Sequence, residues 1–301
     1  MKKVIITGAS GFIGRALSLF LAKKGCLVYA VVRNLKGIIE LQKEKNIIIV
    51  ECNFENYRNM HKMIADNIDV FYHFAWSGVS GKEFKDYDIQ LDNIKYGCDA
   101  LNEAIKIGAK KFVFAGSSHE FKVKRVNQNN KIELRRCCVY GTAKLSCELM
   151  CKTLALQGGI EFNSVIFTNV FGVGDKSNRS TNTILKKMLN YEVPKLVVGN
   201  DLYDWVYIDD VVKGLCVVGE RGVNFKSYYI GNRNLKKLKH IIEEVRDIVV
   251  PEMELKFGEF KDDSFIDYSS ININELYEDT DYLVNSNFKT DILKTIEWLK
   301  K

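Results

Sequence analysis

The chain has 301 residues, of which 47% are apolar and 27% are charged, a composition typical of a globular protein with a substantial core. The net charge of +6 comes from lysines spread along the whole chain rather than from an arginine-rich block, so we expect no nucleic-acid partner. The apolar run at the amino terminus is too short for a signal peptide, and no stretch is long enough to cross a membrane. We therefore expect a cytoplasmic protein with no membrane partner.

The first half of the chain alternates short apolar runs with helical patterns. Strands are predicted at residues 4–6, 28–32, 47–50, 70–74 and 111–115, and helices from about residue 13 and over 88–107. Because the strands are continuously apolar, both faces of their sheet should be covered. The pattern predicts an α/β fold with a Rossmann-type, doubly wound parallel sheet.

The second half begins with a long helix near Tyr140 and a buried strand at 163–167, after which the regularity weakens. Helices are predicted over 182–189 and 235–249, and a short strand over 226–230. We expect residues 171–301 to form mainly a smaller, C-terminal substrate-binding lobe over the strand ends, where open α/β sheets bind ligands. The eight cysteines and four histidines lack the paired spacing of a zinc site, so we expect no metal.

A glycine-rich loop lies between the first strand and the first helix. Gly8, Gly11 and Gly14 form the pattern GxxGxxG, which permits a tight turn and close approach of a pyrophosphate to the helix amino terminus. Residues 1–170 are therefore predicted to be an NAD(P)-binding Rossmann domain, with part of 204–232 returning to it. The predicted cofactor-binding residues of the loop are Gly8, Ser10, Gly11, Phe12, Ile13 and Gly14.

The second strand ends at Arg33, at the position that selects the cofactor. An acidic residue there would accept hydrogen bonds from a ribose 2′-hydroxyl and repel a 2′-phosphate. An arginine instead pairs with the phosphate of NADP. We favour NADP(H), and NAD(H) stays open because a strand-end arginine can simply be solvated.

A tyrosine and a lysine one helical turn apart are the candidates for proton transfer. A free tyrosine has a pKa of about 10, which a neighbouring ammonium lowers. Tyr140 and Lys144 have this spacing, whereas in the second match, from Tyr191 to Lys195, Pro194 breaks the helix. Ser117 follows an upstream strand, where its hydroxyl can bind a substrate oxygen. The predicted catalytic residues are Ser117, Tyr140 and Lys144.

Further motifs repeat a family pattern along nearly the whole chain. They are Thr7–Gly14, Phe74-Ala75, Ser117-Ser118, Tyr140–Lys144, Asn169–Gly172, Asp204–Asp210 and Thr295–Trp298. With them the sequence resembles the extended short-chain dehydrogenase/reductases, the NAD(P)-dependent epimerase/dehydratase family. The resemblance implies a nucleotide-linked sugar as substrate and a homodimer as the assembly. It also implies cofactor contacts from Asn53, Phe74, Ala75, Asn93 and Phe167, and substrate contacts from Ser118, His119, Asn169 and Arg179.

Two positions depart from the family pattern. Arginines that often contact the nucleotide phosphates are replaced by Tyr203 and Ile166. Arg179, Lys186 and Lys187 are the candidates for the missing positive charge.

The segment after Ser117 narrows the reaction that the resemblance implies. It lacks the Asp-Glu pair of dehydratases, and no histidine lies between Asn169 and His240 for a double epimerisation. Residues 116–121 are similar to the Gly-Ser-x-x-Glu-Tyr segment of deoxysugar 4-ketoreductases. We therefore favour NADPH-dependent reduction of a nucleotide-linked 4-keto-6-deoxysugar. The alternatives are an NAD(P)-dependent nucleotide-sugar 4-epimerase and, in another class, a non-catalytic NADP-binding sensor or structural subunit.

Overall fold

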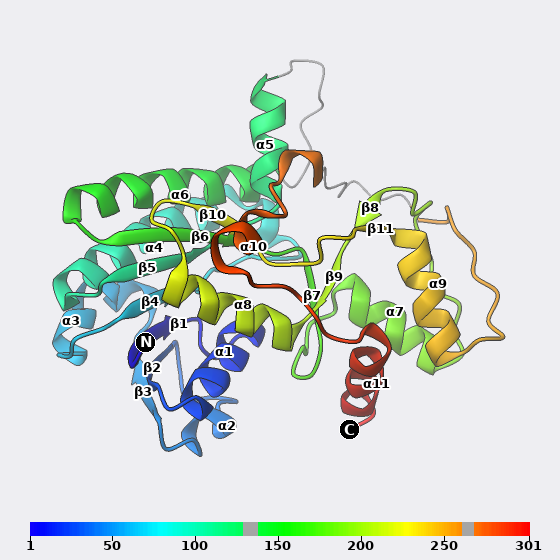
Figure 1. The fold of residues 1–301 in the computed structure, drawn as a ribbon, viewed down its shortest axis with the longest axis horizontal. Helices are drawn as coiled ribbons and strands as arrows, with labels where there is room; N and C mark the ends of the chain where they lie inside the picture. Colours follow the sequence, from blue (N-terminus) through cyan, green and yellow to red (C-terminus); the bar gives the residue numbers. More distant parts are fainter. Residues whose placement is uncertain (129–137, 261–267) are drawn as a thin grey trace.

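A seven-stranded parallel sheet is the centre of the computed structural model, which describes residues 1–128, 138–260 and 268–301 (Figure 1). The strand order is β10-β6-β5-β4-β1-β2-β3, and every pairing between neighbours in this order is parallel. This confirms the predicted fold class. The strands are β1 (Lys3–Thr7), β2 (Leu27–Val32), β3 (Ile47–Glu51), β4 (Val70–His73), β5 (Lys111–Ala115), β6 (Glu161–Ile166) and β10 (Ser227–Tyr229).

Helices cover both faces of the sheet, which explains why the strands are apolar throughout. In β1, Ile6 belongs to the core under α1, α2 and α8, whereas its neighbour Ile5 belongs to the core under α3, α4 and α6. Successive residues of a strand point to opposite faces, so each face needs its own apolar set. These helices are α1 (Phe12–Lys23), α2 (Ile39–Gln42), α3 (Met60–Met63), α4 (Tyr87–Ile107), α6 (Cys138–Gly158) and α8 (Ile208–Arg221).

The last third of the chain forms a group of shorter elements beside the carboxyl ends of the strands (Figure 1). It contains β7 (Asn169–Phe171), α7 (Ser180–Leu189), β8 (Leu202–Tyr203), β9 (Trp205–Tyr207), β11 (Lys236–Lys237), α9 (Leu238–Val249), α10 (Glu275–Thr280) and α11 (Phe288–Leu299). One apolar cluster extends from Val4 and Ile6 of the sheet to Leu185, Ile242 and Ile292 of this group. The core therefore has no break at the predicted boundary, and the division at residue 170 stays a prediction.

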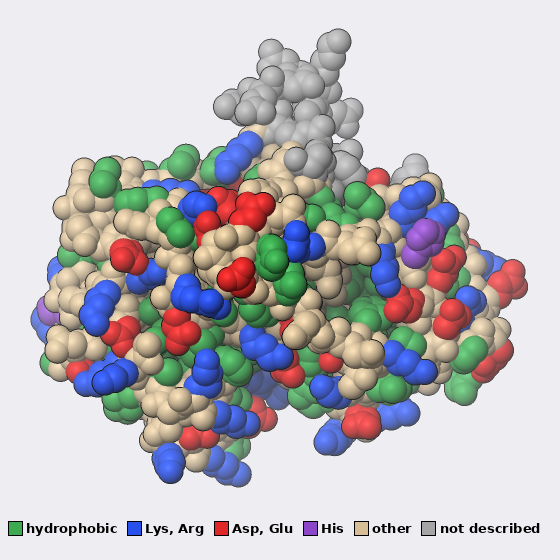
Figure 2. Space-filling view, in the orientation of Figure 1, with side chains coloured by type: hydrophobic (Ala, Val, Ile, Leu, Met, Phe, Trp, Pro, Cys, Tyr) green, Lys and Arg blue, Asp and Glu red, His purple; other side chains and the backbone are tan. Residues whose placement is uncertain are grey.

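The remaining helical segments lie in the connections. They are η1 (Phe54–Asn59), η2 (Glu83–Lys85), α5 (His119–Gln128) and η3 (Tyr268–Ser270). In the part of the chain that the structure describes, no helix is long and apolar enough to span a membrane, and no three His, Cys, Asp or Glu residues are grouped to hold a metal ion. Lysines and arginines on the face in Figure 2 are interspersed with acidic side chains.

Candidate functional site

The glycine loop closes on itself at the start of α1. Gly8 has φ +69°, and a Cβ there would lie 2.8 Å from the backbone nitrogen of Ala75. A Cβ on Gly14 would collide with the carbonyl oxygen of Gly8, to which the Gly11 N–H donates at 2.9 Å. No side chain caps the amino terminus of α1, so its first N–H groups are available to an anion such as a pyrophosphate.

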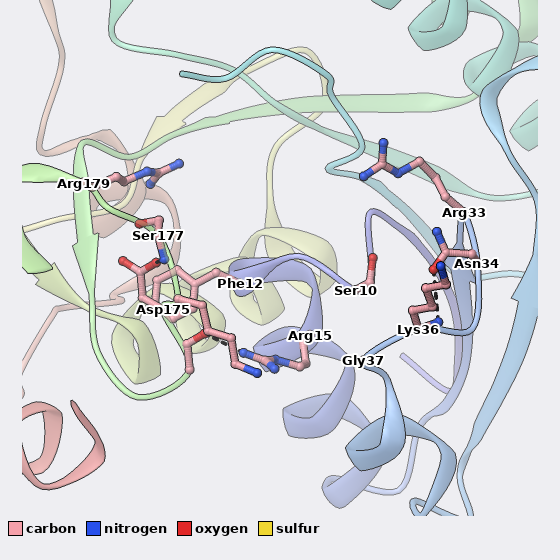
Figure 3. A pocket seen from close by; sticks show the side chains of 12 residues that line it. Ser10, Phe12, Arg15, Arg33, Asn34, Lys36, Gly37, Asp175, Ser177 and Arg179 are labelled. Atoms are coloured by element: carbon pink, nitrogen blue, oxygen red, sulfur yellow. Dashed lines mark hydrogen bonds between the residues drawn. The ribbon is translucent and has the colours of Figure 1, made fainter. Parts of the chain in front are cut away.

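A cavity of about 490 Å³ opens beside this loop. Arg33, Asn34 and Lys36 lie on one side of it, and Asp175, Ser177 and Arg179 lie on the other (Figure 3). The Arg15 guanidinium crosses between the sides and donates to the carbonyl oxygen of Gly174 at 2.5 Å. The lining contains more cationic than acidic side chains, namely Arg15, Arg33, Lys36, Lys176 and Arg179 against Asp175, so the cavity suits a ligand with several negative charges.

A second cavity, of about 390 Å³, holds the predicted catalytic residues. It shares Phe12 and Arg179 with the first, so the two cavities adjoin along the carboxyl ends of β1 and β5. The glycine loop and the Tyr-Lys pair thus line one cavity, as an extended ligand such as a dinucleotide requires. Predicted residues that line the second cavity are Gly8, Gly11, Phe12, Ile13, Gly14, Phe74, Ser117, Ser118, His119, Tyr140, Lys144, Phe167, Asn169 and Arg179.

Tyr140 and Lys144 lie on one face of α6 and are almost fully buried, at 9% and 4% exposure. The Lys144 Nζ donates to the carbonyl oxygen of Ala115 at 2.8 Å and lies 3.6 Å from the ring centre of Trp76. Burial lowers the pKa of Lys144 to about 8. Burial raises the pKa of Tyr140 to about 12, and a hydrogen bond with Ser117 acts in the opposite direction. The prediction that Lys144 lowers this pKa is therefore wrong, because burial of the phenol outweighs the effects that favour its ionised form.

Two aromatic residues that the sequence did not single out shape this end of the cavity. The Phe84 ring stacks on Tyr140 with 4.6 Å between centres, and the Trp76 ring meets Tyr140 edge-on at 6.2 Å. Both come from the connection between β4 and α4 and line the second cavity. They cover part of the phenol ring with apolar surface, and electrostatic interactions are stronger beside apolar surface than in water.

Ser117 lies two residues before α5 and makes hydrogen bonds of the capping-box kind with the first two residues of that helix. Its Oγ accepts from the His119 N–H at 3.2 Å, and its own N–H donates to Oε1 of Glu120 at 2.7 Å. The spacing S-x-x-E is the sequence signature of this motif. It was therefore visible in the sequence, although our prediction used only the serine.

Three predicted cofactor residues do not line either cavity. The Asn53 side chain caps η1 by accepting from the Asn56 N–H at 3.1 Å. Asn93 holds the backbone of Ser77 through two hydrogen bonds of 2.9 Å, and Ala75 supports the turn at Gly8. Direct contact of these residues with a cofactor stays a prediction.

The residues that were candidates for binding the nucleotide phosphates occupy different places in the structure. Arg179 lines both cavities, whereas Lys186 and Lys187 lie in the last turn of α7 and line neither. Tyr203 lines a different cavity, of about 220 Å³, between β8 and α9. Of the three candidate cations, Arg179 is therefore the one placed at the site.

Comparison with known proteins gives the family. The model of the NAD dependent epimerase/dehydratase family matches residues 4–231. The chain belongs to this family. It is an NAD(P)-dependent enzyme of the extended short-chain dehydrogenase/reductase type, as the sequence resemblance implied.

Relatives of the enzyme are distant in sequence. UDP-N-acetyl-alpha-D-glucosaminuronate decarboxylase of Bacillus cytotoxicus is 23% identical over 321 residues, which cover 100% of this chain and 98% of the relative. The uncharacterized protein y4nG of Sinorhizobium fredii is 23% identical over 252 residues, and the match covers 81% of this chain and 60% of that relative. The chain thus spans about three fifths of the y4nG protein.

Solved structures share the fold at similar identity. A mutant of UDP-glucuronic acid 4-epimerase from Bacillus cereus, crystallised with UDP-4-deoxy-4-fluoro-glucuronic acid and NAD, superimposes with a TM-score of 0.81. It is 20% identical, and the superposition covers 99% of each chain. The enzyme therefore has the complete fold of these proteins.

Proposed function

We propose that this enzyme reduces a keto-sugar with NADPH, and that its substrate is a nucleotide-linked 4-keto-6-deoxysugar. The observation that carries the proposal is the single space onto which the glycine loop, Ser117 and Tyr140 all open. The residues fit a dinucleotide, because Gly8 and Gly14 leave no room for a Cβ and α1 has a free amino terminus. NADPH, when bound, supplies the hydride.

Tyr140 is the proton donor in this proposal. Its burial, together with the stacked Phe84 ring, keeps the phenol protonated until negative charge develops on the substrate oxygen, to which it then gives its proton. Ser117 holds that oxygen with a hydroxyl fixed by the capping box. Lys144 keeps a positive charge beside the reacting atoms, anchored on the Ala115 carbonyl, and so stabilises the developing charge.

The cations of the first cavity support NADP over NAD. Arg33, Lys36 and Ser10 line it together on the side of β2, where a 2′-phosphate would lie. We expect Arg33→Asp to weaken NADPH binding about 10- to 100-fold, because a charge-assisted hydrogen bond contributes about 1.5–3 kcal/mol, and to leave NADH binding equal or tighter. Fluorescence titration with both cofactors measures this.

Arg221→Asp, at the exposed end of α8, is the matched control because it makes the same change in net charge away from the cavity. It should leave both affinities unaltered. If Arg33→Asp loses no NADPH affinity relative to this control, the assignment of Arg33 to the 2′-phosphate is wrong.

The 4-epimerase alternative is favoured by one specific observation. The structural neighbour from Bacillus cereus is named a 4-epimerase and was crystallised with NAD. An epimerase needs the same Tyr140, Lys144 and Ser117, because it removes a hydride and returns it to the other face of the sugar. The two reactions therefore differ in whether the nicotinamide is consumed.

The deciding experiment adds a panel of nucleotide-linked 4-keto-6-deoxysugars to the enzyme with NADPH and follows the nicotinamide absorbance. We expect stoichiometric loss of that absorbance with at least one sugar. Interconversion of nucleotide sugars without net loss would establish the epimerase instead. Tight cofactor binding without turnover of any sugar would support the non-catalytic sensor or structural subunit.

A homodimer in the cytoplasm stays our expectation, and one feature supports the dimer. Helices α4 and α6 leave five large apolar side chains exposed, namely Tyr87, Leu91, Leu149, Met150 and Leu156. A second copy of the chain would remove this apolar surface from water. The mass of the protein in solution decides it.

A further inference from the structure

Glu120 lies directly behind the predicted catalytic serine and has no contact with solvent, at 0% exposure. Its Oε1 accepts from the Ser117 N–H at 2.7 Å. A Cβ on Gly116 would lie 3.1 Å from the same oxygen, so the absence of a side chain at Gly116 lets the carboxyl group lie against the backbone. The carboxyl group of Glu120 is therefore enclosed by protein.

Glu148 of α6 forms a side-chain hydrogen bond with Glu120 and is also buried, at 3% exposure. Its Oε1 accepts from Ser164 Oγ at 2.8 Å, Ser227 Oγ at 2.9 Å and Lys152 Nζ at 2.7 Å. The Lys152 ammonium and the hydroxyl pair of Ser164 and Ser227, which are also hydrogen-bonded to each other, satisfy a negative charge at this oxygen. Accordingly, the pKa of Glu148 is lowered to about 2, where burial is outweighed by hydrogen bonds from Glu120, Lys152 and Ser164.

The second oxygen of Glu120 has no such donors. Oε2 is buried and has no hydrogen-bond donor among the described residues. An ionised Glu120 would therefore place a second carboxylate beside Glu148 with one oxygen unsatisfied, which is costly in a buried site. A proton on Glu120, donated to Glu148, removes both penalties.

The charged groups around Glu120 favour the same state. Burial, and then the charge of Glu148, raise the pKa of Glu120 well above its usual range. The hydrogen bond from the Ser117 N–H and the Lys144 ammonium act in the opposite direction with smaller effects. Tyr140, on the same helix as Glu148 and Lys144, would be harder to ionise beside a charged Glu120. The titratable groups among these all lie on α6.

We propose that Glu120 is a positioning residue that holds Ser117 at the substrate oxygen as a neutral carboxylic acid, sharing its proton with Glu148. The inference rests on the proposed function for the role of Ser117. A neutral acid fixes the Ser117 backbone without adding negative charge next to an oxygen that itself becomes negative during reduction. An ionised glutamate would oppose that developing charge.

Glu120→Gln and Glu120→Ala separate this role from a purely structural one. Glutamine keeps the acceptor for the Ser117 N–H and offers an N–H donor to Glu148, so we expect it to rescue turnover. Alanine removes both, and we expect kcat to fall about 100-fold, as for a misplacement of about 1 Å at a reacting group. Asn287→Ala removes an exposed cap of α11, where Asn287 accepts from the Thr290 N–H at 3.0 Å, and controls for the loss of a cap elsewhere.

Three readouts need no turnover. The infrared C=O band of a protonated carboxylic acid should be present at neutral pH in the wild type and absent in Glu120→Gln. Hydrogen exchange at the Ser117 amide should stay slow in Glu120→Gln and become fast in Glu120→Ala. The wild type loses stability as the pH rises above about 5, because the native state keeps a proton that the unfolded chain releases, so the Tm of Glu120→Gln should rise relative to the wild type over that range.

Each contrary result would overturn one part of the proposal for Glu120. If alanine keeps the rate and the slow exchange, Glu120 does not position Ser117. If glutamine is as inactive as alanine, or if no protonated band disappears, Glu120 does not act as a neutral acid. If no sugar is reduced by the wild type, the proposed function fails, while the infrared and exchange measurements still decide the state and the positioning role of Glu120.

Discussion

The Tyr140→Phe enzyme is expected to bind NADPH as tightly as the wild type and to reduce its substrate about 10³-fold more slowly. Proton transfer by a positioned side chain contributes about 10²–10⁴-fold to catalysis. The phenol is buried and held between the Phe84 and Trp76 rings, so water cannot readily replace it as donor. Phenylalanine keeps these ring contacts, which confines the change to the hydroxyl. Single-turnover absorbance of the nicotinamide measures the rate.

Tyr191→Phe is the matched control, because Tyr191 begins the other Tyr-x-x-x-Lys sequence. That residue is 76% exposed and has φ +57° just after the end of α7. Its hydroxyl therefore does not face Lys195 across a helical turn, and we expect unchanged turnover. If Tyr140→Phe retains the wild-type rate, the proton donor is another group.

The parallel sheet could be predicted because its signal is local. Each of the runs at 4–6, 28–32 and 111–115 is apolar on both faces, and the structure gives each face its own core. The last third gave a weaker signal because its strands are very short, as in Leu202–Tyr203 and Lys236–Lys237. Strands of this length are fixed by tertiary pairing rather than by any sequence periodicity.

The site could be predicted where a motif keeps its residues close in the sequence. The glycine loop and the pair of Tyr140 and Lys144 each lie within one or two turns of chain. Trp76 and Phe84 have no such mark, because they reach Tyr140 only when the connection before α4 folds over the strand ends. Long-range packing of this kind carries no spacing rule.

The placement of the cationic side chains around the substrate could not be predicted from the sequence, as Arg179 shows. We predicted Arg179 as a substrate-binding residue and kept Lys186 and Lys187 as further candidates for the missing positive charge. The structure separates them because Arg179 precedes the first turn of α7 at the cavity, and the two lysines lie at the far end of that helix. Each residue of a helix advances along the helix axis by about 1.5 Å, so charges at the two ends of α7 lie far apart. The sequence alone does not show which end of the helix faces the cavity.

Lys144→Met is expected to slow reduction strongly and, at the same time, to stabilise the protein. The pKa of Lys144 is lowered by burial from 10.5 to about 8, and a shift of this size corresponds to about 3 kcal/mol of unfavourable charge burial. Methionine fills similar volume without that charge but leaves the Ala115 carbonyl without its donor, which costs about 1 kcal/mol. We therefore expect a net gain of about 2 kcal/mol at pH 7 and a loss in kcat of about 10²-fold or more.

The stability difference between Lys144→Met and the wild type should depend on pH. Between about pH 8 and 10.5 the unfolded chain holds a proton on Lys144 that the native protein lacks, so wild-type stability rises with pH in this window. The advantage of Lys144→Met should accordingly be largest below pH 8 and shrink above it. Thermal unfolding of both proteins across this range measures the difference in Tm.

Lys111→Met is the matched control, because Lys111 is likewise a strongly buried lysine, at 6% exposure. Its Nζ donates to the Gly222 carbonyl at 2.7 Å and lies 3.1 Å from Oε2 of Glu161, and it lines neither cavity. Its removal leaves these partners unpaired, so we expect lower stability and unchanged turnover. If Lys144→Met is destabilised to the same extent as Lys111→Met, the charge of Lys144 is paired in the native state. In that case the buried Lys144 does not lower the stability of the enzyme for the sake of catalysis.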